Sequence, residues 1–233
     1  MQYLQDFYKA LKSRWAGSLV KVGQLRQPHA KEYLNKLAKE GLVERVAWGW
    51  YWVPAQVKDV WDFLAKDQNY KVVAAQTAAS FWNQDFIHRN VYRIRVRDES
   101  YGKALQVFGH ARGWEIVTEP LDRQTKYVKV GRLLVEDMHQ SIVGCIQDWA
   151  FTDAFAVLYA NRHRVKWDEL LQEAYWKRVS GTNIRARQVL EYGGSLFNGV
   201  SGQRVFKATK PRLEDDFVRR EIEEAVGKVV ELA

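Results

Sequence analysis

The sequence predicts an α+β protein in two parts, an N-terminal winged helix-turn-helix and a C-terminal mixed domain with a small antiparallel sheet and a helical block. Three observations lead to this prediction. Residues 4–54 follow the order helix, short helix, helix and hairpin; residues 92–135 contain strand-like runs; and residues 136–192 turn to helical spacing. With 233 residues, the chain is long enough to bury two small cores.

Two amphipathic helices are expected near the N-terminus. The first carries apolar residues from Leu4 to Trp15 at three- and four-residue steps and ends at Gly17. The second is expected to begin at Pro28, which suits a first helical position, and to end before Gly41. The apolar face of this second helix consists of Ala30, Tyr33, Leu34, Leu37 and Ala38.

A β-hairpin should follow the second helix. Residues 42–46 and 50–53 are rich in strand-forming residues, and a tight reversal at Ala47-Trp48-Gly49 separates them. This order of elements is that of a winged helix-turn-helix, whose third helix enters the DNA major groove while the hairpin contacts the backbone.

The remainder of the chain is expected to hold a small sheet followed by helices. Strand-like runs cover residues 92–97, 105–108, 114–118 and 127–135, and helical runs cover residues 56–66, 72–82, 141–159, 167–178 and 184–192. The last helical run should end at Gly193-Gly194. The predicted domains are residues 1–55 (winged helix-turn-helix), 56–70 (helical linker), 71–197 (α+β domain) and 198–233 (loop and C-terminal helix).

The last helix, within residues 213–232, has two interpretations. Its apolar residues step by four, three, four and three, which is the spacing of a helix that packs along a partner. It either lies on its own domain or forms a dimer contact, so we expect a monomer or a weak dimer. These apolar residues are Val218, Ile222, Ala225, Val229 and Leu232.

Composition narrows the class of protein. The formal charge is +8, and residues 1–55 carry nine basic against four acidic side chains, whereas residues 131–233 are balanced. An excess of cations at the N-terminus favours a polyanionic partner there. No apolar stretch approaches the length of a membrane helix and no signal peptide is recognisable, so we expect a soluble, cytoplasmic protein without a membrane partner. The single cysteine, Cys145, leaves no pair for an internal disulfide or a thiolate zinc site.

The second helix and the hairpin supply candidate DNA-binding residues. Asn35 could bind adenine, Glu32 a cytosine amine, and His29 or Lys36 a guanine edge, with Lys39 on the same face. The alternative is an ordinary solvated helix face. Candidate phosphate contacts, and the aromatic residue near the hairpin tip that could press on a sugar, are Lys21, Arg26, Lys31, Arg45 and Trp48.

A second basic surface could lie on the strand at residues 92–97. Arg93, Arg95 and Arg97 alternate there and would project from one face about 6.7 Å apart, close to the spacing of successive phosphates. Pairing with acidic side chains of a neighbouring strand explains the same pattern.

Signatures of an enzyme are weak, and we expect no catalytic residues, metal or cofactor. Asp148 and Asp153 would need a third acid to bind a metal ion. No phosphate-binding loop, nucleophile elbow or dinucleotide fingerprint is present. The histidines never fall at helical metal-binding spacing; they are His29, His88, His110, His139 and His163.

The order of these motifs resembles the AbiEi-type antitoxins of type IV toxin–antitoxin and abortive-infection systems. The likeness covers residues 3–192. It depends on the order in which the motifs appear, since each occurs in many proteins. The segments that carry it are Leu37-Ala38-Lys39-Glu40-Gly41-Leu42-Val43-Glu44-Arg45, Gly49-Trp50-Tyr51, Ala74-Ala75-Gln76-Thr77-Ala78-Ala79, and the helical block from Glu136 through Trp167-Asp168-Glu169-Leu170-Leu171 to Tyr192.

The resemblance implies a DNA-binding autorepressor that acts on double-stranded operator repeats of its own operon. It further implies a C-terminal antitoxin domain that counters a genetically linked nucleotidyltransferase-like toxin without a stable complex. The chain departs from the family pattern in its short segment before the second helix and in the tryptophans of the hairpin. Two other functions stay open: a metal-dependent DNA-processing enzyme targeted by a winged helix, and an RNA-binding or adaptor protein.

Overall fold

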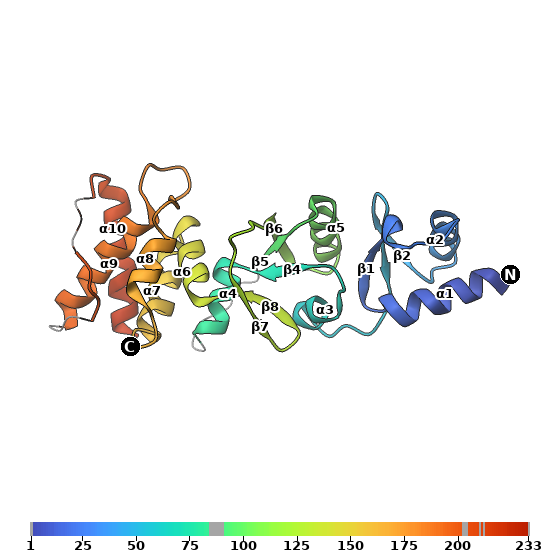
Figure 1. Ribbon diagram of the computed structural model, residues 1–233, viewed down its shortest axis with the longest axis horizontal. Coiled ribbons are helices and arrows are strands. Elements are labelled where there is room, and N and C mark those ends of the chain that lie inside the picture. The colour runs from blue at the N-terminus through green and yellow to red at the C-terminus, as the bar shows by residue number, and fades with distance from the viewer. Residues whose placement is uncertain (1, 84–90, 202–204, 210, 212, 233) are drawn as a thin grey trace. The chain divides into compact units, whose positions relative to one another are not determined.

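The computed structural model describes residues 2–83, 91–201, 205–209, 211 and 213–232, and it is a mixed α+β structure (Figure 1). Contacts divide the chain into two compact units, which are described separately below. The first unit comprises Met1–Val72, Asn90–Arg123 and Lys129–Leu134. The second comprises Val73–Arg89, Gln124–Val128 and Val135–Ala233. This division by contact does not follow the boundaries at 55 and 70 that the sequence patterns suggested.

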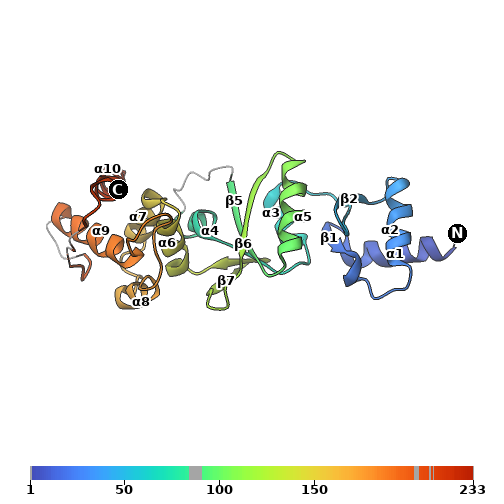
Figure 2. The same ribbon diagram turned by 90° about the horizontal axis from the view of Figure 1, so that it is seen from above.

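The elements at the start of the first unit follow the predicted order of helix, short helix, helix and hairpin, with one additional strand at Ser18–Lys21 that was not predicted. They are α1 (Gln2–Trp15), β1 (Ser18–Lys21), the 3₁₀ turn η1 (Val22–Gln24), α2 (Ala30–Lys39), β2 (Glu44–Ala47) and β3 (Trp50–Val53). The strands form an antiparallel sheet in the order β1-β3-β2. Figures 1 and 2 both show α1 and α2 side by side next to this sheet.

A continuous apolar core joins these helices to the sheet. Helix α1 contributes every third or fourth residue, as its spacing predicted, and α2 contributes the same kind of stripe. The buried residues are Phe7, Leu11, Trp15, Val20, Ala30, Leu34, Leu37, Val43, Tyr51 and Val53. This packing fixes which side of α2 faces solvent.

The start of α2 differs from the prediction. Pro28 lies in a turn rather than at the first helical position, and α2 begins at Ala30. The residue that precedes the helix is His29, which has a left-handed backbone (φ 62°) and no capping hydrogen bond from its side chain. Pro28 restricts the backbone before the helix, as expected of proline. The helix begins two residues after it, although the sequence predicted that the helix would begin at the proline itself.

The rest of the first unit contains α3 (Val60–Lys66), β5 (Val91–Val96), α5 (Glu99–His110) and β6 (Glu115–Pro120). The strand prediction for residues 105–108 was wrong, because these residues lie within α5. Asp98 caps this helix by accepting hydrogen bonds from the backbone N–H groups of Ser100 and Tyr101. A four-residue apolar run fits a buried helix face as well as a strand.

The second sheet is not the small antiparallel sheet that the sequence predicted. Its order is β6-β5-β4-β8-β7, with β4 at Lys71–Val73, β7 at Tyr127–Val130 and β8 at Leu133–Glu136. The pairs β5–β6 and β4–β8 are parallel. Parallel neighbours need a crossover connection, and α5 provides it between β5 and β6. Because residues 105–108 were predicted to be a strand, the sequence predicted no crossover helix between β5 and β6 and therefore no parallel pair.

The second unit is built mainly from helices, seen together in Figure 2. They are α4 (Ala75–Trp82), α6 (Met138–Gln147), α7 (Phe151–Ala160), α8 (Trp167–Glu173), α9 (Ala186–Ser201) and α10 (Asp216–Glu231). The expected single helix over 141–159 is broken near Trp149, whose φ is 63°. Helix α10 buries Val218, Ile222 and Val229 in the core of its own unit, so the interpretation as a tail helix packed on its own unit is confirmed.

The glycine pair of α9 has a different role from the one predicted. Gly193 and Gly194 lie inside the helix, which continues to Ser201, and do not end it. A Cβ atom on Gly193 would overlap the ring of Phe155, and one on Gly194 would lie 2.9 Å from a ring carbon of Trp167. The glycines are therefore needed for close helix packing. Within the described ranges, no helix combines the length and apolar character needed to span a bilayer.

Candidate nucleic-acid interface

Helix α2 presents a polar face opposite its core contacts. Ala30, Leu34 and Leu37 are buried, and at helical spacing the positions between them turn toward solvent. The candidate residues that the structure exposes together on α2 and at its N-cap are His29, Lys31, Glu32, Lys36 and Lys39. The grouping predicted from the sequence therefore holds for five of the six residues proposed on this helix.

The charges on this face are mostly unneutralised. Nδ1 of His29 lies 3.3 Å from Oε2 of Glu32, and both side chains are more than half exposed, so this pair contributes little to stability. Among the residues that the structure describes, no carboxylate pairs with Lys31, Lys36 or Lys39. Three such ammonium groups on one helix make the cationic surface that contact with phosphates requires.

Asn35, the sixth residue proposed on this helix, is half-buried and already bonded. Its Oδ1 atom accepts a hydrogen bond of 2.6 Å from the hydroxyl of Tyr51 on β3. Adenine recognition uses the carbonyl oxygen and the amide N–H₂ of asparagine together. The oxygen has a second lone pair, so both functions can coexist. In the structure, the Asn35 side chain connects α2 to β3 through this hydrogen bond.

Lys21 is engaged within the first unit rather than free for phosphate. Its Nζ atom lies 3.1 Å from a carboxylate oxygen of Asp98 and 2.7 Å from the hydroxyl of Ser100, and it sits 5.6 Å from the ring centre of Trp50. Burial raises the pKa of Asp98, but hydrogen bonds from Ser100 and Lys21 outweigh it, so this pKa lies below its usual value. Lys21 thus links β1 to the start of α5.

The hairpin tip exposes one tryptophan and one arginine. Trp48 is 85% exposed, while Trp50 and Trp52 are buried. The guanidinium carbon of Arg45 lies 5.8 Å from the centre of the Trp48 ring. An exposed ring next to a guanidinium can contact a sugar and a phosphate at once.

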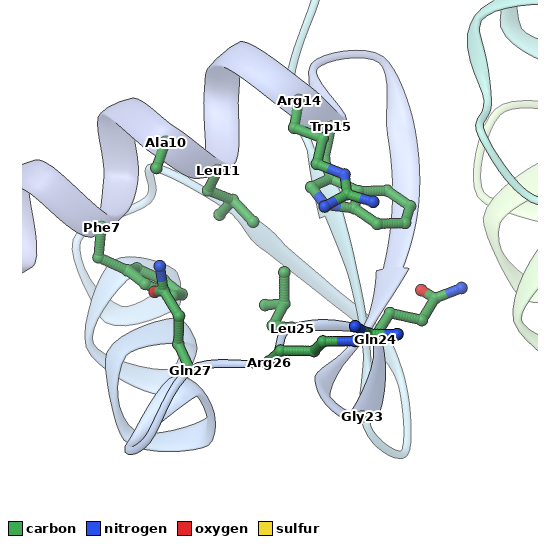
Figure 3. Close-up of a pocket in the computed structure, with 10 residues that line it drawn as sticks. All are labelled: Phe7, Ala10, Leu11, Arg14, Trp15, Gly23, Gln24, Leu25, Arg26 and Gln27. Carbon is green, nitrogen blue, oxygen red and sulfur yellow. The ribbon is translucent and has the colours of Figure 1, made fainter.

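A groove lies between α1 and the segment 23–27 that leads into α2, with a volume of about 720 Å³. Leu25 points from this segment toward Leu11 of α1, and Arg14 lies next to Trp15 (Figure 3). Arg26, another predicted phosphate contact, is exposed at the edge of the groove. The groove occurs where η1 and an irregular segment replace a longer second helix. Arg14 was missed from the sequence, although its exposed position on α1 adds to the same basic region.

A buried polar cluster fixes the sheet of the N-terminal elements to the rest of the first unit. The carboxylate of Asp67 accepts hydrogen bonds from the hydroxyl of Ser18 (2.8 Å), from the backbone N–H of Leu19 (2.9 Å) and from Nζ of Lys71 (3.1 Å). It also accepts one from the hydroxyl of Tyr101 (2.5 Å). Burial, and then the charge of Asp67, raises the pKa of Tyr101 well above its usual value. No sequence pattern marks Asp67, because its partners come from three separate segments.

The arginines of β5 are not a free row of cations. The guanidinium of Arg93 lies 2.7 Å from a carboxylate oxygen of Glu119, and Nε of Arg95 lies 3.6 Å from its other oxygen. The parallel register of β5 and β6 places Arg95 opposite Glu119. Arg97 is exposed and lies over the ring of Tyr70, 4.1 Å from its centre. The structure therefore has the ion pairing that the sequence offered as the alternative to a second basic surface.

Among the residues that the structure describes, the two aspartates considered for metal binding do not form a metal site with other side chains. Asp148 ends α6, and Asp153 is buried within α7. His88 lies outside the described residues. Over the ranges that the structure describes, no group of three histidine, cysteine, aspartate or glutamate side chains is arranged to hold a metal ion.

Comparison of the chain with protein-family models and with curated proteins found no match.

Proposed function

We propose that the protein binds double-stranded DNA through α2 and the β2–β3 hairpin, in the manner of a winged helix-turn-helix, and represses transcription of its own operon. In this proposal α2 lies in the major groove of an operator repeat and the hairpin contacts the adjacent backbone. Repression then follows from blocking polymerase.

The observation that carries the proposal is the cationic face of α2. Lys31, Lys36 and Lys39 extend from a helix whose other side is anchored in a core, and exposed Arg26 and Arg45 flank it. A rigid helix with an exposed basic face beside a short hairpin is suited to insertion into a groove about 12 Å wide. Lys21 is left out of the phosphate contacts because Asp98 and Ser100 engage it.

We also propose that the protein is the antitoxin of a type IV toxin–antitoxin system, in which the second unit opposes a nucleotidyltransferase-like toxin. This part depends on the resemblance to the AbiEi-type antitoxins. It is tested by co-expressing the full chain with a nucleotidyltransferase-like protein from the adjacent gene. We expect growth to be restored, and restored equally by a Lys36→Gln variant that binds operator poorly. Continued growth arrest with the unaltered chain would refute the antitoxin role.

DNA binding is tested with duplex DNA from upstream of the protein's own gene. We expect Lys36→Gln to weaken binding several-fold and to lower the slope of log affinity against log salt by about 1, because one phosphate contact is lost. The matched control is Lys103→Gln on α5, which removes one exposed lysine that pairs with Glu99. Equal losses from both variants would mean that only net charge matters and would contradict an interface on α2.

Sequence discrimination is tested at Asn35. We expect Asn35→Ala to reduce the preference for operator over random duplex, because it removes a base-reading amide. Tyr51→Phe is the control, since it deletes the hydroxyl that holds Asn35 but keeps the amide. If Tyr51→Phe causes the same loss of preference, Asn35 acts only by positioning α2.

A further inference from the structure

A short segment of the second unit, residues 174–187, connects α8 to the first turn of α9 and is held in a defined conformation. The backbone N–H of Val179 donates to the carbonyl of Ile184 (3.0 Å), and the N–H of Ala186 donates to the carbonyl of Lys177 (2.9 Å). Arg178 and Arg185 form an antiparallel bridge. The side chain of Val179 is fully buried in the core of the unit. The segment is therefore a small anchored hairpin.

This hairpin displays aromatic rings. Trp176 is 78% exposed, and its ring lies edge to face with that of Tyr175, with 4.6 Å between centres. Large apolar side chains in a folded unit are usually covered, so a tryptophan left open next to a second ring is informative. The Trp176 ring is therefore open at the surface, with the half-buried Tyr175 ring roughly at right angles to it.

The same hairpin carries only positive charge. From Ala174 to Leu190 the sequence has four basic residues and no acidic residue, although residues 131–233 as a whole are balanced. The guanidinium carbon of Arg185 lies 5.2 Å from the ring centre of Tyr175 and 5.7 Å from that of Trp176. Arg187 lies 5.6 Å from the Tyr175 ring and pairs with Glu191. Cations therefore border the rings on the hairpin itself.

A cleft of about 380 Å³ adjoins the rings. Leu171 contributes an apolar surface, while Asp168 and Gln172 of α8 contribute exposed polar groups. A cleft with an aromatic side, an apolar part and side chains that can hydrogen bond to a base edge matches what an unstacked nucleobase requires.

We propose that this hairpin binds single-stranded nucleic acid, with a base stacked on Trp176, the edge of that base next to Tyr175, and the backbone phosphates near Arg178 and Arg185. Single strands are bound by aromatic platforms bordered by cations, because every base has a face that can stack. A duplex does not offer free base faces, and an acidic peptide has no rings of this kind to stack. This proposal is independent of duplex binding by α2, since it concerns residues of the other unit.

The test uses fluorescein-labelled single strands of about 12 nucleotides, one RNA and one DNA of the same sequence, followed by fluorescence anisotropy. We expect Trp176→Ala to weaken binding of the preferred strand by about 5- to 150-fold, the usual contribution of one stacked base. The matched control is Phe217→Ala on α10, which removes an aromatic ring that is 55% exposed in the same unit. Circular dichroism verifies that both variants fold.

Each outcome decides the proposal. A loss with Trp176→Ala and not with Phe217→Ala supports it, and the tighter of the RNA and DNA strands identifies the source of the ligand. Equal losses from both variants, or no binding of either strand, overturn it. So does an oligoglutamate peptide that binds with the same dependence on Trp176, because that result identifies an acidic protein partner. This proposal is tested with single strands and Trp176→Ala, whereas duplex recognition is tested with operator DNA and Lys36→Gln, so failure of one is distinguishable from failure of the other.

Discussion

Asp67 shows why a single buried residue can matter more for the stability of the first unit than any residue on the exposed face of α2. Its carboxylate holds Ser18 and Leu19 of β1, Lys71 and Tyr101 in one cluster, and its side chain is fully buried. A buried carboxylate is tolerated when hydrogen bonds and a countercharge satisfy it. The connection explains why residues 1–72 and 90–123 form one compact unit rather than separating at residue 55.

Replacing Asp67 should therefore be costly. We expect Asp67→Asn to lower the free energy of unfolding by about 3–5 kcal/mol, because it leaves the ammonium of Lys71 buried without its countercharge. Urea denaturation at neutral pH measures this loss. The same chemical change at Glu99, which pairs with Lys103 at an 84% exposed position, should have little effect. A comparable loss from Glu99→Gln would contradict the special role of the buried cluster.

Asp98 should make the first unit sensitive to acid. Its pKa in the folded protein lies below the ordinary 3.8, so it contributes stability above that pH and loses the contribution as the pH falls through the folded value. Asparagine at this position can still cap α5 but carries no charge. We expect Asp98→Asn to be less stable than the unaltered protein at pH 7, and the difference to be smaller at pH 2. Urea denaturation at the two pH values measures the difference; a constant difference would disprove it.

At the scale of elements, amphipathic spacing predicted the helices well. The strand-like runs did not predict which strands pair or that some pairs are parallel. The stripes of α1, α2 and α10 were readable because each helix buries one face in a core of its own unit. The hairpin was readable from its glycine turn, and Gly49 has the expected positive φ of 73°. The parallel strand pairs could not be predicted from the sequence, because the register and the partner of a strand depend on residues far apart in the chain.

Helix α9 shows a related difficulty. Two adjacent glycines usually favour a helix end, yet Gly193 and Gly194 lie where the Phe155 and Trp167 rings leave no room for a side chain. The low helix propensity of glycine was outweighed by the packing of these rings against α9, which only the folded unit reveals. The exposed α2 face was predictable because it needs only helical periodicity, whereas the bond from Tyr51 to Asn35 required knowledge of the tertiary structure.

The glycines of α9 can be tested against each other. We expect Gly193→Ala to destabilise the protein by about 1–3 kcal/mol through overpacking. Gly199→Ala on the same helix meets nothing within 4 Å, so it should stabilise by about 0.5–1 kcal/mol through helix propensity. Thermal unfolding of the two variants provides the comparison. Two changes of the same sign would show that packing at Gly193 is not limiting.

For the molecule as a whole, the sequence predicted the mixed α+β class and the basic N-terminus, but not the grouping into compact units. Charge is additive along the chain and can be counted, whereas a unit is defined by contacts between distant segments. The proposed functions follow the same division. Duplex recognition belongs to the first unit and single-strand binding to the second in these proposals, and each depends on cations that border a rigid element.

The unequal surroundings of the lysines have a consequence for chemical labelling. An amine-acylating reagent attacks only uncharged, accessible amines, so Lys31, Lys36 and Lys39 should react quickly in the free protein. Lys71, whose Nζ donates three hydrogen bonds in a buried cluster, should react slowly. Mass spectrometry of the acylated peptides would then map the DNA footprint without any mutation: operator should protect the α2 lysines and leave Lys103 reactive. Protection of Lys103 with the α2 lysines still reactive would locate the footprint elsewhere.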